Sequence, residues 1–73
     1  MAPKLPVLSA REVLKALSKA GFLQVGQAGS HLRLKHANGR IVMVPNHPEV
    51  AVGTLLSILR QTGLRRNEFL RLL

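Results

Sequence analysis

Polar and apolar residues alternate strictly along residues 30–36, directly after Gly29. Alternation over this length is typical of a strand with one buried face, because successive side chains of a strand point to opposite sides. The pattern therefore predicts a strand over residues 30–36. Its apolar face consists of Leu32 and Leu34, and its polar face consists of His31, Arg33 and Lys35.

Residues 10–20 have the pattern of an amphipathic helix. Ser9 and Glu12 stand at the spacing of a capping box, in which each side chain accepts a hydrogen bond from the other residue's backbone amide. Gly21 is a favourable residue just after a helix. These features predict a helix from about Ala10 to Ala20. Its apolar stripe consists of Val13, Leu14, Leu17 and Ala20.

Two further strands are predicted beside the strand of residues 30–36. Residues 22–28 carry Leu23 and Val25 on one strand face, and Gly29 marks a tight turn. Residues 37–39 include an Asn-Gly pair, which suits a hairpin loop, and residues 40–44 follow as a third strand that ends before Pro45. Connections this short predict an antiparallel meander.

A second helix is predicted over residues 52–62, after a loop at 46–49 and before Gly63. Its buried face consists of Leu55, Leu56, Ile58 and Leu59. Residues 64–73 are predicted to form one or two further helical turns that direct Phe69, Leu72 and Leu73 toward the core. The order is α-β-β-β-α with a short C-terminal helix, an α+β class in which helices cover one face of a three-stranded antiparallel sheet.

Length and charge narrow the class of partner. The 73 residues suffice for a single domain, 1–73, and carry 11 Lys and Arg against three Glu, a formal net charge of +8. Such a charge favours a nucleic acid or an acidic protein as the partner rather than a membrane. Two Phe and no Trp or Tyr leave no base-stacking platform. Without cysteine there is no disulfide and no thiolate metal site.

No apolar run reaches the roughly 20 residues that span a bilayer. Residues 1–8 contain two prolines and do not read as a signal peptide. We therefore expect a cytoplasmic protein.

The polar face of residues 30–36 carries the candidate chemistry. An imidazole exchanges protons near neutral pH, so His31 is a candidate general base or acid that would remove the proton of an RNA 2′-hydroxyl. Arg33 and Lys35 would contact phosphate, Ser30 would orient the site, and Arg40 is a further candidate RNA contact. The three Glu are far apart in sequence, so neither a metal site nor another cofactor is expected.

The other two histidines receive different interpretations. His36 ends its strand and is interpreted as structural or incidental. His47 lies in a Pro-bounded loop beside the third strand and is an auxiliary candidate for catalysis or phosphate binding, with a structural role equally open. A zinc site built from the three histidines lacks a fourth ligand.

Several segments resemble the HicA family of small toxins from toxin–antitoxin pairs. The most specific are Gly29-Ser30-His31 and the Gly-Thr-Leu…Ile-Leu-Arg-Gln-x-Gly-Leu pattern of residues 53–64, and residues 19–22, 38–40 and 44–47 also match. The resemblance implies a fold similar to double-stranded-RNA-binding domains and a ribosome-independent mRNA interferase. It also implies His31 as the catalytic residue, mRNA as substrate, and a HicB-type antitoxin partner in a bacterial or archaeal cytoplasm.

Two positions depart from the patterns that this resemblance brings with it. Arg65 stands where family members usually have Ser or Thr as the N-cap of the last helix, which favours a later start capped by Asn67. Residues 50–54 lack the lysine cluster with which double-stranded-RNA-binding domains begin their second helix. The usual mode of duplex RNA binding is therefore not expected.

Three functional hypotheses follow from the sequence. The leading one is a metal-independent endoribonuclease toxin. The first alternative is a non-catalytic nucleic-acid-binding module, whose binding would survive loss of the His31 imidazole. The second is a protein-interaction domain whose positive charge serves only an acidic partner.

Overall fold

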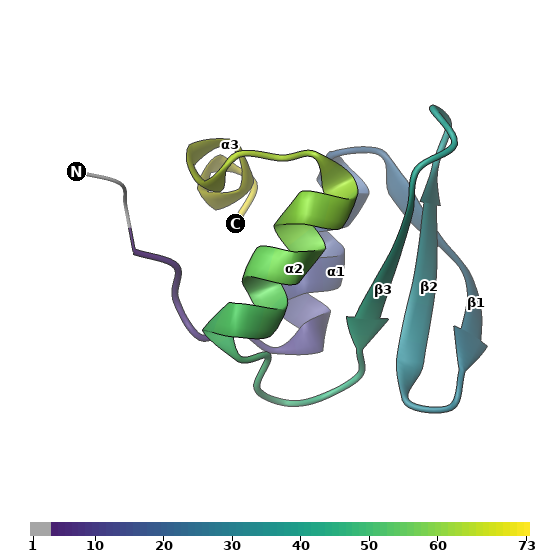
Figure 1. Ribbon diagram of the computed structural model, residues 1–73, viewed down its shortest axis with the longest axis horizontal. Helices are drawn as coiled ribbons and strands as arrows, with labels where there is room; N and C mark the ends of the chain where they lie inside the picture. The colour runs from purple at the N-terminus through teal and green to yellow at the C-terminus, as the bar shows by residue number, and fades with distance from the viewer. Residues whose placement is uncertain (1–3) are drawn as a thin grey trace.

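The computed structural model describes residues 4–73 of the chain, so the expectation for residues 1–8 lies partly outside the described residues. Among the described residues, no helix is long and apolar enough to cross a membrane. The elements follow one another as predicted (Figure 1). They are α1 (Ala10–Lys19), β1 (Phe22–Ala28), β2 (His31–His36), β3 (Ile41–Pro45), α2 (Val52–Thr62) and α3 (Arg66–Arg71).

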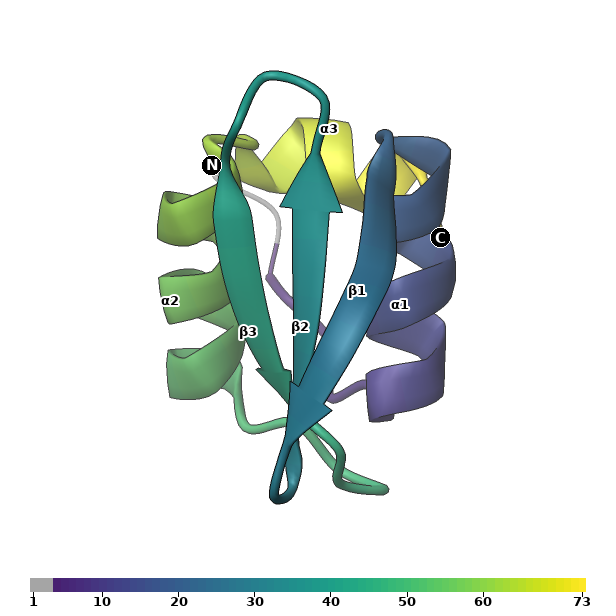
Figure 2. The same cartoon turned by 90° about the vertical axis from the view of Figure 1, so that its right-hand side faces the viewer.

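The three strands form one antiparallel sheet in the order β1-β2-β3. Figure 2 shows the sheet in front with the helices behind one of its faces. We call the other face, which the helices leave uncovered, the open face. This arrangement confirms the predicted α+β fold and is that of a double-stranded-RNA-binding-domain-like protein.

The strand register agrees with the alternating pattern. Leu32 and Leu34 are buried against the helices, whereas His31, Arg33 and Lys35 are exposed on the open face. Burial of a Leu side chain contributes about 2 kcal/mol. A slip of one residue would expose both leucines and bury two cations, so the register is strongly specified.

Tight connections set the ends of the strands. The β1–β2 turn has two central residues, Gly29 with φ of 58° and Ser30 without a positive φ, which is the sign pattern of a type II′ turn. Strand β2 consequently begins at His31, one residue later than predicted. Strand β3 is also shifted by one residue and includes Pro45 rather than ending before it.

The predicted capping box of α1 is confirmed. The Glu12 amide donates to Ser9 Oγ at 3.2 Å, and the Ser9 amide donates to Glu12 Oε1 at 3.1 Å. Buried residues from the helices and strands then meet in one apolar core. Its largest fully buried side chains are Phe69, Leu17, Leu34, Leu55, Ile58, Val13, Val42, Val44 and Val50.

Some apolar side chains are less buried than the sequence suggests. Leu73 is 49% exposed, so its predicted inward position is wrong, because α3 ends at Arg71. Leu56 and Leu72 are only partly buried against the core. Leu23 and Val25, on edge strand β1, are 64% and 58% exposed.

The last helix begins earlier than a cap at Asn67 would require, so that prediction is wrong. Helix α3 starts at Arg66, directly after Arg65. The Arg65 side chain offers only donors and cannot accept a hydrogen bond from the helix amides. Instead, the Glu68 carboxylate accepts a hydrogen bond of 2.9 Å from the Arg65 amide, which is the half of a capping box that a carboxylate provides.

Candidate active site and nucleic-acid surface

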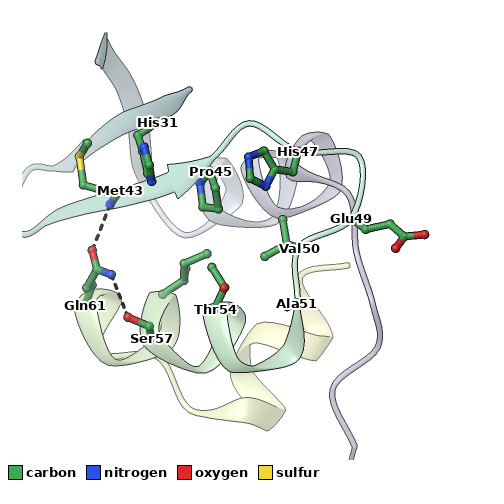
Figure 3. A pocket seen from close by; sticks show the side chains of 11 residues that line it. His31, Met43, Pro45, His47, Glu49, Val50, Ala51, Thr54, Ser57 and Gln61 are labelled. Carbon is green, nitrogen blue, oxygen red and sulfur yellow. Dashed lines mark hydrogen bonds between the residues drawn. The ribbon is translucent and has the colours of Figure 1, made fainter. Parts of the chain in front are cut away.

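His31 is the first residue of central strand β2 and lies opposite Ala28 on one side and Pro45 on the other. Because both neighbouring strands fix its backbone, the position of the imidazole is set by the sheet rather than by a loop. The side chain is exposed and lines a groove between β3 and α2 (Figure 3). An accessible imidazole held on a rigid strand is suited to proton transfer.

The groove has a volume of about 410 Å³. Strand β3 forms one wall with Met43 and Pro45, which share the open face with His31. Helix α2 forms the opposite wall with a polar stripe of three residues. These are Thr54, Ser57 and Gln61, whose spacing of three and four residues places them on one helical face.

Gln61 joins the two walls of the groove. Its Oε1 atom accepts a hydrogen bond of 3.0 Å from the Met43 amide, and its Nε2 atom donates to Ser57 Oγ at 3.4 Å (Figure 3). The Met43 amide points away from β2, so Gln61 satisfies a donor on the free edge of β3. Residue Pro45 lies two positions further along the same edge and has no amide hydrogen to leave unpaired.

Arg33 and Lys35 extend the open face away from His31 along β2. They lie opposite Met43 and Ile41 respectively, and both are exposed. Each step of two residues along a strand covers roughly 7 Å, which is close to the spacing of successive phosphates in an extended single strand. Neither cation lines the groove itself.

Ser30 is exposed in the turn before β2. Its carbonyl accepts a hydrogen bond of 2.6 Å from the Asn46 amide, which ties the turn to the loop after β3. This contact helps to bring His47 to the groove that His31 lines. The structure therefore gives Ser30 a positioning contact through its backbone.

Arg40 lies at the opposite end of the sheet from His31. Its guanidinium donates to the Gln61 carbonyl at 3.2 Å and packs against Gly63, so it covers the C-terminal end of α2. Lys35 is the nearest of the predicted RNA contacts, since it lies opposite Ile41, the residue after Arg40. The structure thus places Arg40 near Lys35 but at the other end of the sheet from His31 and Ser30.

The two remaining histidines occupy different environments. His47 lines the groove with His31, and its carbonyl accepts a hydrogen bond of 2.9 Å from the Ala10 amide. His36 packs against Phe22 with ring centroids 4.9 Å apart, and its Nδ1 atom accepts from the Asn38 amide at 3.0 Å. These contacts give His36 a structural role at the hairpin.

The sequence reasoning missed the α2 wall of the groove. It assigned α2 to the core through its leucines and did not interpret Thr54, Ser57 and Gln61. Their helical spacing is a visible signal of a polar face, but the sequence does not show that this face lies beside β3. Glu49 also lines the groove, yet within residues 4–73 no three His or Glu side chains gather as metal ligands.

The fold and the exposed basic strand define a small α+β protein of the double-stranded-RNA-binding-domain type. The comparison with protein families then identifies the group. The model of the HicA toxin of bacterial toxin–antitoxin systems matches residues 10–64, so the chain belongs to the HicA toxin family. It is therefore a toxin of a toxin–antitoxin system. The match includes His31 and the whole groove and leaves α3 outside, and no match was found among curated proteins.

Proposed function

We propose that this toxin is a ribosome-independent and metal-independent endoribonuclease that cleaves mRNA in the cytoplasm, with His31 as its general acid–base residue. The domain would comprise residues 1–73. The observation that carries the proposal is the placement of an exposed imidazole on a strand, between a groove and two exposed cations on the same face, Arg33 and Lys35.

The chemistry uses a nucleophile that RNA itself supplies. His31 removes the proton of a 2′-hydroxyl, and the oxygen attacks the adjacent phosphorus while the bond to the 5′-oxygen breaks. The 5′-oxygen leaves with a proton from a second acid, for which His47 in the same groove is the candidate. The products carry a 2′,3′-cyclic phosphate and a 5′-hydroxyl. Arg33 and Lys35 stabilise the charge that develops on the phosphoryl oxygens.

The acidic residues of the chain favour this route over a metal-assisted one. Mg²⁺ is usually bound through carboxylates. The chain has three Glu and no Asp. Glu12 and Glu68 are engaged in caps at the starts of α1 and α3, which leaves Glu49 as the carboxylate that lines the groove.

The test compares induced wild-type chain with His31→Ala and with Lys19→Ala, an exposed control on α1. We expect wild type and Lys19→Ala to arrest growth and degrade mRNA, whereas His31→Ala loses at least about 100-fold in cleavage rate, as expected for a general base. Purified wild type should cleave RNA equally well with and without EDTA. Equal mRNA integrity in all three cultures would refute the enzymatic role, and loss of cleavage in EDTA would refute the metal-free route.

The charge of +8 also favours a second candidate, a toxin that binds nucleic acid without cleaving it. This candidate predicts salt-dependent RNA binding that is unchanged in His31→Ala, with no cleavage products. A HicB-type antitoxin would neutralise either form by covering the open face with an acidic surface. If the chain binds no RNA at low salt, a role in protein interaction alone becomes the better interpretation.

A further inference from the structure

The groove beside His31 has a different character from the strand that carries the cations. Its lining includes no Lys or Arg, although the chain has 11 of them. Away from the two imidazoles, a phosphate in the groove would find no Lys or Arg and would face the Glu49 carboxylate. The uncharged part of a nucleotide suits this lining better. With the phosphates along Arg33 and Lys35, the groove lies where a base next to the cleaved bond would fall.

The walls of the groove combine apolar surface with unused polar groups. The half-buried Met43 and Pro45 supply the apolar surface, and the buried Val50 and Ile58 lie behind it. A volume of about 410 Å³ lies within the roughly 300–1,000 Å³ of typical small-ligand pockets. Sequence-specific recognition of RNA commonly targets unstacked bases, which stack on rings such as His and have their edges contacted by hydrogen bonds.

The polar stripe of α2 is only partly used within the protein. Gln61 holds the Met43 amide, and Ser57 Oγ accepts from Gln61, so the Ser57 hydroxyl hydrogen points elsewhere. No side-chain hydrogen bond within residues 4–73 involves Thr54, and no buried side-chain polar atom of these residues lacks a partner, so the Thr54 hydroxyl reaches solvent. Two hydroxyls are therefore free to bind a base.

We infer that the groove between β3 and α2 binds one unpaired nucleobase of the RNA, and that Thr54 and Ser57 determine which base is accepted. The inference rests on the proposed RNA cleavage. Ser57 Oγ already accepts from Gln61, so the Ser57 hydrogen and the remaining hydrogen of Gln61 Nε2 are donors, whereas the Thr54 hydroxyl can donate or accept. Beside Ser57 and Gln61 the groove therefore favours a base edge that presents acceptors. Rejection of a wrong base follows because its donors would leave these groups unpaired.

The test maps the 5′ ends of products that purified chain releases from a synthetic single-stranded RNA library. The variants are Ser57→Ala and Thr54→Val, with Ser18→Ala on α1 as an exposed hydroxyl control. We expect wild type and Ser18→Ala to share one base preference near the cut. In each groove variant, that preference should fall by about three- to tenfold, the usual effect of one lost neutral hydrogen bond. Thermal unfolding checks that each variant is folded.

If folded Ser57→Ala and Thr54→Val keep the base preference of wild type while His31→Ala is inactive, the inferred base selection by the groove is refuted and the proposed cleavage stands. A second measurement separates the opposite case. Fluorescence anisotropy with short oligonucleotides of each base reports binding by His31→Ala, alone and combined with Ser57→Ala. Suppose that wild type does not cleave RNA but that His31→Ala binds one base more tightly than the others, and that Ser57→Ala reduces this difference. Base binding by the groove is then supported and the proposed cleavage is refuted. Absence of both cleavage and preference refutes both.

Discussion

Gly21 lies where the chain passes from α1 into β1, directly beneath the His36 ring. Its φ is 94°, and a Cβ atom there would lie 2.8 Å from His36 Nε2. The ring has little freedom to move, since it packs against Phe22 and accepts the Asn38 amide. Because Gly21 has no side chain, the end of α1, the start of β1 and the β2–β3 hairpin can pack closely at this point.

Gly21→Ala should destabilise the protein by about 2 kcal/mol, because L-residues lose roughly 1–2 kcal/mol at positive φ and the ring must shift as well. Chemical denaturation measures the change. Gly53→Ala on α2 is the matched control, since a Cβ there meets nothing within 4 Å. It should raise stability by about 0.5 kcal/mol through helix propensity. Equal effects of the two substitutions would contradict this explanation.

At the scale of elements, the groove depends on how α2 is held against the edge of β3. Two contacts from the last turn of α2 do this, one through the Gln61 side chain and one through the Gln61 carbonyl to Arg40. The Met43 amide would otherwise be an unpaired donor on a sheet edge. The same side chain therefore closes the edge and fixes the distance between the groove walls.

Gln61→Leu should lower stability by about 1–2 kcal/mol, because the part-buried Met43 amide loses its acceptor while the apolar volume is kept. Hydrogen exchange measured residue by residue should show lost protection at Met43 before any effect in α1. Arg60→Ala, an exposed neighbour on α2, is the control and should change stability by less than about 0.5 kcal/mol. Full protection of Met43 in Gln61→Leu would show that the bond is not needed.

Several elements were predictable because their signals are local. The capping box of α1, the alternation of β2 and the hairpin loop at 37–39 each lie within a few residues of sequence. The start of α3 was missed although its signal is also local, because Arg65 is a poor N-cap residue and only Glu68, three residues on, marks the cap. The α2 wall of the site was missed for another reason. It lies beside His31 only because the chain folds back over β3.

At the scale of the whole molecule, positive charges lie on both sides of the sheet, but only those on the open face share a face with His31. Arg33 and Lys35 lie on the open face, whereas exposed Lys15 and Lys19 lie on α1 behind the sheet (Figure 2). Long-range attraction of RNA depends on the total charge, while direct phosphate contacts depend on position. The two contributions can therefore be separated by substitution.

The double variant Arg33→Gln/Lys35→Gln should bind single-stranded RNA more weakly than Lys15→Gln/Lys19→Gln. Both remove two positive charges from the net +8. Loss of two phosphate contacts should lower the slope of log affinity against log salt by about 1.4, because each contact to a single strand contributes roughly 0.7. Binding titrations from low to moderate salt give both slopes. Equal slopes for the two double variants would mean that RNA contacts the open face no more than it contacts α1.

The two sides of α2 have independent tasks. Leu55, Ile58 and Leu59 are buried in the core, while Thr54 and Ser57 are half-buried and line the groove. We therefore expect substitutions at these two positions to leave the fold intact. If the groove selects a base as proposed, duplicated copies of such a toxin gene could diverge in the transcripts that they cleave without first losing a folded product.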